Sequence, residues 1–148
     1  MPSVHASAVL VGARAVLIRG PSGAGKSRLA LALLRAAEVG QIPFAMLVAD
    51  DRSHLEPRHD RLLVRPAAEL KGLIEVRGLG IRRLPHEPVA VVGLVVDLGA
   101  ADSARLPEPA GERVTIDGIE LARLAVAGGA DPLPLVVAAL ATRREPDR

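Results

Sequence analysis

The chain has 148 residues, of which 49% are hydrophobic and 24% charged, which predicts one globular domain with a sizeable core and excludes a disordered chain. Cysteine is absent and Phe44 is the only aromatic residue, so disulfides, thiolate metal sites and an aromatic platform for single-stranded nucleic acid are excluded. The net charge of +2 comes with scattered arginines rather than a basic stripe, so we expect no nucleic-acid partner.

Neither a membrane span nor a secretory signal is expected. No apolar run reaches the roughly 18–20 residues that a spanning helix needs. The first five residues contain no basic segment of the kind that opens a signal peptide. These observations predict a cytoplasmic protein with no membrane partner.

The hydrophobic pattern predicts an α/β fold with a mixed sheet. Short strands are expected at residues 9–11, 15–18, 44–49, 62–64, 73–77 and 89–96. Helices are expected at residues 27–37 and 132–141. The dipeptide Asp117-Gly118 predicts the tight turn of a hairpin. Loops are expected at residues 52–60 and 98–112. We expect one domain over residues 1–142 and a flexible tail over residues 143–148.

A phosphate-binding pattern follows the second predicted strand. The pattern G-x-x-x-x-G-K-[ST] is matched in full by Gly20, Pro21, Ser22, Gly23, Ala24, Gly25, Lys26 and Ser27. Its glycines allow successive backbone N–H groups to surround a polyphosphate at a helix N-terminus, which favours anions. Lys26 is expected to contact the β- and γ-phosphates, and the Ser27 hydroxyl to ligate Mg²⁺. The sequence therefore predicts binding of ATP with Mg²⁺.

Two adjacent acidic residues, Asp50 and Asp51, follow the apolar run at residues 44–49. The carboxyl ends of parallel strands share one edge of a sheet, so we expect these aspartates in the same crevice as the phosphate loop. An acidic residue at such a position holds Mg²⁺ in P-loop proteins, a role predicted for Asp50. Successive strand residues point in opposite directions, so only one carboxylate is expected to face the γ-phosphate and accept a proton from an attacking hydroxyl. Alternatively, both carboxylates only complete a metal shell or cap a helix.

A second acidic position lies in the string Glu75-Val76-Arg77-Gly78-Leu79-Gly80-Ile81. The two-residue period of a strand predicts that Glu75 and Arg77 share one face, where the acid would hold Mg²⁺ and the base a phosphate oxygen. A solvated strand face followed by a turn is the alternative interpretation.

In order along the chain, His5, the loop at residues 20–27, the segment 47–52 and the string at residues 75–81 resemble the catalytic domain of the HPr kinase/phosphorylase family. The string E-x-R-G-L-G-I is the most specific part of this resemblance. The match covers residues 5–83 well and the remainder loosely. It implies a P-loop fold similar to phosphoenolpyruvate carboxykinase, in the short form of the family that carries only the kinase domain.

The resemblance implies ATP-dependent phosphorylation of a serine on HPr, the small phosphocarrier of the sugar phosphotransferase system. It also implies a reverse reaction, in which inorganic phosphate attacks the phosphoserine, and a hexameric assembly. Ser27 and Glu75 would hold Mg²⁺, and Lys26 would stabilise the transferring phosphoryl group. Asp51 would accept the serine proton, while His5 would help to set its protonation.

A later catalytic arginine of the family is matched by Arg105. The family also has an arginine-containing loop near its C-terminus that is linked to dephosphorylation, whereas residues 127–131 of this chain contain no arginine. We therefore predict that phosphorolysis is weak. Two other functions remain open: a small-molecule kinase of the nucleoside-monophosphate or shikimate type, and an ATP-binding regulatory module without catalysis. The first would need an arginine-rich lid, and no clear lid is evident.

Overall fold

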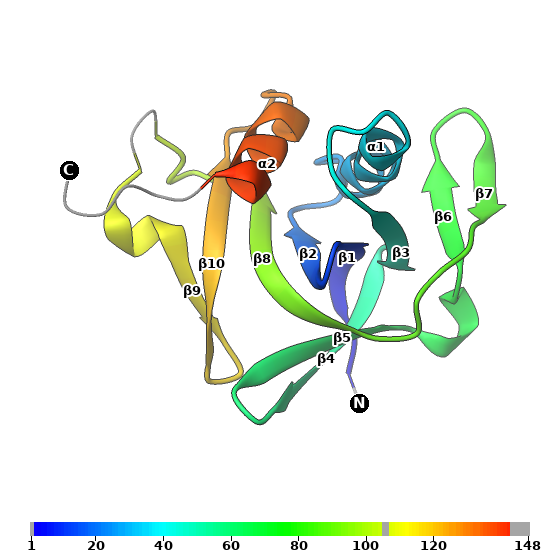
Figure 1. Ribbon diagram of the computed structural model, residues 1–148, viewed down its shortest axis with the longest axis horizontal. Coiled ribbons are helices and arrows are strands. Elements are labelled where there is room, and N and C mark those ends of the chain that lie inside the picture. The colour runs from blue at the N-terminus through cyan, green and yellow to red at the C-terminus, as the bar shows by residue number, and fades with distance from the viewer. Residues whose placement is uncertain (1, 105–106, 143–148) are drawn as a thin grey trace.

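The computed structural model describes residues 2–104 and 107–142, which form one twisted mixed sheet with two helices on one side of it and a separate two-stranded sheet (Figure 1). Its helices and strands, in chain order, are β1 (Val4–Val11), β2 (Arg14–Arg19), α1 (Lys26–Glu38), β3 (Ala45–Ala49), β4 (Arg52–Arg58), β5 (Arg61–Pro66), β6 (Leu73–Val76), β7 (Gly80–Arg83), β8 (Ala90–Leu98), β9 (Arg113–Ile116), β10 (Ile119–Val126) and α2 (Pro132–Ala141). Short 3₁₀ turns lie at Ala68–Leu70 and Pro109–Glu112. None of the helices within the described residues is long and apolar enough to cross a membrane.

The direction of the strands places four loops along one edge of the sheet. β2 and β10 run parallel to β8, and β1 pairs antiparallel with both β2 and β3. β2, β3, β8 and β10 therefore point the same way, and the segments that follow them meet at a common edge. The expectation that the loop after β2 and the aspartates after β3 share an edge is thus satisfied, although β1 lies between these two strands.

Strand pairing closes part of the sheet into a ring. β1 pairs with β2, β2 with β8, β8 with β5, β5 with β4, and β4 with β1. The ring encloses a cluster that includes Leu17, Val48, Leu62, Val64 and Val95, all of them fully buried. A second cluster, on the opposite face of the sheet, is covered by α1 and α2. The buried apolar strands predicted from the sequence therefore serve two separate cores.

Most predicted elements are present, with boundaries within a few residues. α1 extends one residue further at each end than predicted, and α2 has the predicted bounds. The turn between β9 and β10 has positive φ angles at Asp117 and Gly118, as predicted for this dipeptide.

The prediction of a polar loop at residues 52–60 is wrong, because β4 occupies most of this segment. β4 pairs with β5 along its whole length, so main-chain hydrogen bonds hold it despite its few apolar side chains. The strands are joined at His59 and Asp60, which have φ angles of 50° and 64° and turn the chain sharply.

A charged network fastens β2, β8 and β10 together. Asp97 on β8 accepts two hydrogen bonds from Arg19, at 2.7 and 2.8 Å, and one from Arg123 at 2.6 Å. Arg123 also donates to both oxygens of Asp102, at 2.7 and 3.0 Å. Burial alone would raise the pKa of Asp97, but the hydrogen bonds and charges of the two arginines outweigh it and hold that pKa below its ordinary value.

Replacing Asp97 with asparagine is expected to lower the free energy of unfolding at pH 7 by about 1.5–3 kcal/mol, because hydrogen bonds to a charged acceptor are lost. The lowered pKa means that this contribution is present above about pH 4 and fades as the pH falls through the folded-state pKa. Urea unfolding at pH 7 and in acid should therefore show wild type and Asp97→Asn converging at low pH. Glu38→Gln, at an exposed position on α1, is the control, and an equal effect of both variants would contradict the prediction.

Candidate functional site

The Gly20–Ser27 loop leaves β2 and leads directly into the first turn of α1. Gly25 precedes the helix with a φ of 102°, a conformation that L side chains rarely adopt. A Cβ on Gly20 would lie 3.0 Å from the Cβ of Leu98, so glycine allows the loop to pack against the end of β8. The pattern seen in the sequence is therefore required by this backbone path.

Lys26 is buried within this loop, with 8% of its surface exposed. Its Nζ donates to the carbonyl oxygens of Gly20 at 2.8 Å and Pro21 at 3.2 Å. The ammonium group therefore bridges the first two carbonyls of the loop.

The carboxylate of Asp50 is the hub of the site. It is 4% exposed and accepts hydrogen bonds from three segments that are distant in sequence. Ser7 Oγ donates at 2.7 Å, Ser27 Oγ at 2.7 and 2.8 Å to the two oxygens, and the Glu75 backbone N–H at 3.1 Å. Asp50 thus joins β1, the start of α1 and β6 to the end of β3.

Asp51 adopts a φ of 67°, uncommon for a residue with a side chain. The Arg52 N–H donates to the Asp50 carbonyl at 2.8 Å, so the chain makes a three-residue turn centred on Asp51. The Asp51 N–H donates to Ser7 Oγ at 3.1 Å. This turn directs the Asp51 carboxylate away from Asp50 and into solvent, where its side chain is 63% exposed.

His5, the second residue of β1, lies beside Asp51. Its Nδ1 is 4.0 Å from Asp51 Oδ1, and both side chains are largely exposed. Five residues selected from the sequence therefore lie together at one edge of the sheet in the structure: His5, Lys26, Ser27, Asp50 and Asp51.

The two remaining described candidates, Glu75 and Arg77, lie on the β6–β7 hairpin. The backbone of Glu75 contacts Asp50, but its side chain is exposed. The prediction that both residues share a strand face is wrong, because β6 ends at Val76 and Arg77 belongs to the turn that follows. Arg105 and the tail at residues 143–148 lie outside the described residues.

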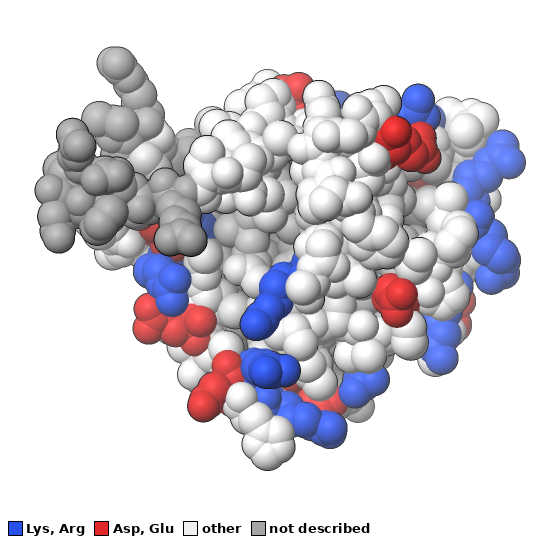
Figure 2. Space-filling view, in the orientation of Figure 1, with Lys and Arg blue, Asp and Glu red and all other residues white. Residues whose placement is uncertain are grey.

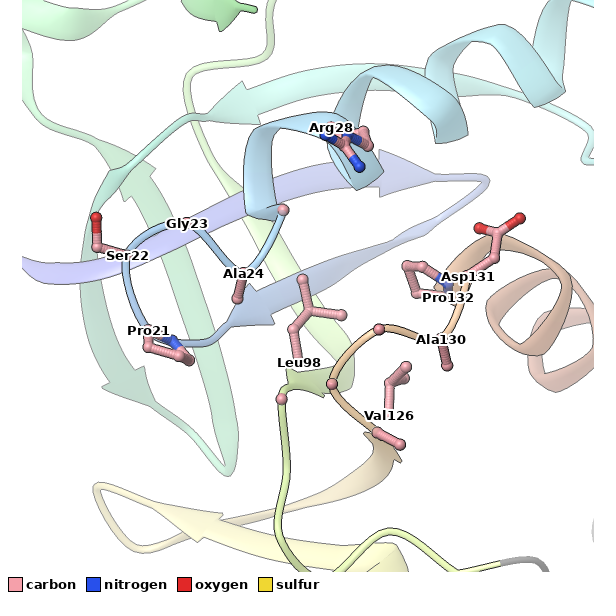
Figure 3. Close-up of a pocket in the computed structure, with 15 residues that line it drawn as sticks. Pro21, Ser22, Gly23, Ala24, Arg28, Leu98, Val126, Ala130, Asp131 and Pro132 are labelled. Atoms are coloured by element: carbon pink, nitrogen blue, oxygen red, sulfur yellow. The ribbon is translucent and has the colours of Figure 1, made fainter.

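A cavity of about 780 Å³ opens beside the loop, between residues 21–25 and residues 126–132. Figure 3 shows Leu98 between Ala24 and Val126, while Arg28 on α1 and Asp131 before α2 project from its rim. The N-terminal end of α1 lines this space and favours anionic groups, whereas the N-terminus of α2 is capped by the Asp131 carboxylate, which accepts a hydrogen bond from the Leu133 N–H at 3.2 Å.

Sequence reasoning missed Ser7, which is fully buried and bonded to both aspartates. The signal was one hydroxyl residue within the apolar run at residues 6–11, flanked by Ala6 and Ala8. Such a residue needs a polar partner in the folded protein, but the sequence alone does not tell which partner.

Comparison with known proteins places this chain in a family. Residues 1–85 match the family model described as the HPr serine kinase C-terminal domain. The chain therefore belongs to this family.

Among curated relatives, the HPr kinase/phosphorylase of Geobacillus thermodenitrificans (strain NG80-2) is 35% identical over 138 residues, which cover 84% of this chain and 41% of that protein. The HPr kinase/phosphorylase of Limosilactobacillus reuteri (strain DSM 20016) is 41% identical over 80 residues, which cover 53% of this chain and 23% of that protein. The chain thus spans less than half the length of these two relatives.

The solved structure of the Hpr(Ser) kinase/phosphatase from Coxiella burnetii shares the fold. It matches with a TM-score of 0.72 at 22% sequence identity, over 93% of this chain and 87% of that chain. The predicted α/β fold with a mixed sheet is confirmed at this level.

Replacing Ser7 with alanine is expected to lower the free energy of unfolding by about 1–3 kcal/mol, because Asp50 loses a donor and the Asp51 N–H loses its acceptor in a buried setting. Urea unfolding measures the change. Ser22→Ala, which removes an exposed hydroxyl from the neighbouring loop, should have little effect. The same stability in both variants would show that the hydroxyl of Ser7 does not hold the two aspartates.

Proposed function

We propose that this chain is an ATP- and Mg²⁺-dependent protein-serine kinase that phosphorylates HPr. Membership of the family supports the reaction class, and the curated relatives are named HPr kinase/phosphorylase. The observation that carries the proposal is the Ser27–Asp50 pair at the end of the loop, with the exposed carboxylate of Asp51 one residue away.

The fold on which this site is built is, in our proposal, the P-loop fold of the phosphoenolpyruvate carboxykinase type, with residues 1–142 forming the catalytic domain. We further propose a cytoplasmic protein and a hexamer, as the family resemblance implies. Leu135 and Leu140, which are 46% and 37% exposed on α2, give this helix an apolar outer face suited to assembly.

ATP would lie with its triphosphate along residues 20–27. The backbone N–H groups of the loop and the Lys26 ammonium supply donors and positive charge for the phosphates. The cavity between this loop and residues 126–132 has space for the nucleoside. Lys26 would exchange its bonds to the loop carbonyls for bonds to phosphate oxygens.

The residues at the end of the loop fit a hard divalent cation. Ser27 and Asp50 present a hydroxyl and a carboxylate in direct contact, and oxygen donors of these types suit Mg²⁺. Glu75 would supply a further carboxylate from β6. When bound, Mg²⁺ would neutralise charge on the phosphates.

Transfer requires a base for the attacking serine. We propose that the HPr serine oxygen forms a bond to the γ-phosphorus while the bond to the β–γ bridging oxygen breaks and ADP leaves. Asp51 Oδ1 or Oδ2 takes the serine proton, and His5 Nδ1 lies 4.0 Å from Asp51 Oδ1. Lys26 and Arg77 would stabilise charge on the transferring group, and Arg105 is proposed to join them.

Replacing Asp51 with asparagine should lower kcat for HPr phosphorylation by about 10²–10⁴-fold, because the proton acceptor is lost. Affinity for ATP should be unchanged, since the loop and Asp50 are intact. Transfer of γ-labelled phosphate from ATP to HPr measures the first quantity, and titration with nucleotide measures the second. Asp60→Asn is a matched control, because Asp60 is also exposed with a positive φ of 64° but belongs to the β4–β5 turn.

Equal activity of wild type and Asp51→Asn would rule out Asp51 as the base. Label on a nucleoside monophosphate or shikimate instead of HPr would favour a small-molecule kinase. ATP binding without transfer to any acceptor would favour a regulatory module.

In the reverse assay, we propose slow phosphate-driven removal of phosphate from phospho-HPr, because residues 127–131 carry no cation. Reverse and forward rates of equal efficiency would contradict that part of the proposal.

A further inference from the structure

The β6–β7 hairpin stands apart from the main sheet. Its two strands pair only with each other, and the pair lies beside α1 at the right of Figure 1. Ile74 is 1% exposed and Val76 is half-buried, and both pack against the cluster under α1. One face of the hairpin is therefore anchored, while its other face and its turn are free.

Apolar residues occupy the free part of the hairpin. Leu79 in the turn and Ile81 on β7 are 62% and 64% exposed. Exposed large apolar side chains that lie together commonly mark a surface for a partner. Ile81 pairs directly with Glu75 across the hairpin, so these two side chains lie on the same face.

Positive charge surrounds these apolar side chains. Arg77, Arg82 and Arg83 are all exposed, and none of them forms an ion pair with another residue of the described chain. Figure 2 shows blue side chains along the outer edge of the molecule where the hairpin lies. Arg83 pairs with Leu73 and lies on the same face as Ile81 and Glu75, whereas Arg82 pairs with Ile74 and lies on the other face. A partner that covers Leu79 and Ile81 would therefore meet the unneutralised guanidinium group of Arg83 on that face.

The hairpin is joined directly to the candidate site. The Glu75 N–H donates to the Asp50 carboxylate at 3.1 Å, and Asp51 follows Asp50 in the chain. The free face that carries Glu75 and Ile81 thus begins at the Asp50 hub and ends at Leu79. A protein that presents a hydroxyl to Asp51 has the hairpin as an adjacent surface on this side.

We infer that Leu79, Ile81 and Arg83 form a docking surface for the protein substrate, whose acceptor serine is bordered by an apolar patch with a carboxylate at its rim. The inference rests on the proposed function and names the surface that selects the substrate. A second copy of this chain fits less well, because a two-fold contact would bring the same arginine of both copies face to face. Opposite charge on the substrate would also speed its encounter with the enzyme.

A double variant and a single variant test this surface with HPr as the probe. Leu79→Ser with Ile81→Ser removes the apolar contacts, and Arg83→Glu reverses the rim charge. Each should raise the KM for HPr by about 10-fold or more, because interface anchors commonly contribute at least this much. The kcat at saturating HPr and the affinity for ATP should stay at wild-type values. Added salt should raise the wild-type KM and have less effect on the charge-reversed variant.

Matched controls separate docking from general surface effects. Val39→Ser alters an apolar residue that is 73% exposed at the far end of α1. Arg61→Glu alters an exposed arginine that has no ion pair within the described residues. Both should leave the KM for HPr unchanged. Equal increases in controls and hairpin variants would overturn the inference.

Two further measurements complete the experiment: direct binding of HPr to each variant, and the oligomeric state of each variant by sedimentation. If wild type phosphorylates HPr and the hairpin variants have an unchanged KM, the docking surface is wrong while the proposed function stands. If HPr binds in a hairpin-dependent manner but receives no phosphate, the docking surface stands and the proposed function fails. If the hairpin variants change only the oligomeric state, the surface contacts a second copy and the inference is overturned. Absence of HPr binding to wild type would contradict both.

Discussion

The structure of the site depends on one buried carboxylate. Asp50 is removed from solvent at the end of β3, where an unpaired charge would be costly, and it is stabilised by donors from β1, α1 and β6. The bonds from Ser27 and from the Glu75 N–H also fix the position of Ser27 against the loop and the position of the β6–β7 hairpin. Ser7, which bonds to Asp50 and to the Asp51 N–H, also fixes the turn that exposes the Asp51 carboxylate. One buried acid and one exposed acid are thus held side by side, and they suit two different chemical tasks.

The arrangement of strands places these two acids beside the loop and the cavity. Since β2, β3, β8 and β10 point the same way, the loop, the aspartates and the cavity walls all lie at one edge of the sheet. The Arg19–Asp97–Arg123 network holds β2, β8 and β10 together near this edge. At that edge the Asp51 carboxylate is open to solvent, while the Gly20–Ser27 loop packs closely against the core where Gly20 meets Leu98. Rigid positioning of this kind is what phosphoryl transfer requires from a protein.

Local sequence patterns predicted much of the fold and part of the candidate site. The path of the Gly20–Ser27 loop into a helix, the period of α1 and the turn at Asp117-Gly118 depend on contacts between near neighbours, and the predicted backbone is present at all three. β4 was missed because its stability comes from pairing with β5 rather than from its own apolar residues. Ser7 was missed because its partners are 43 and 44 residues away in sequence. Arg77 was assigned to a strand because alternation of residue types does not reveal where the strand turns. The cavity required the loops after β8 and β10 to meet the loop after β2, which no local pattern encodes.

The central claim is that Ser27 and Asp50 form the metal end of a nucleotide site, and the most direct test is the Mg²⁺ dependence of nucleotide affinity. Calorimetric titration of a non-hydrolysable ATP analogue, with Mg²⁺ and with EDTA, would be carried out on wild type, Asp50→Asn and Ser27→Ala, each first shown to be folded by circular dichroism. We predict that wild type binds the analogue more tightly with Mg²⁺, and that both variants keep the affinity measured in EDTA but lose the gain from Mg²⁺. A full Mg²⁺ effect in both variants would contradict the account.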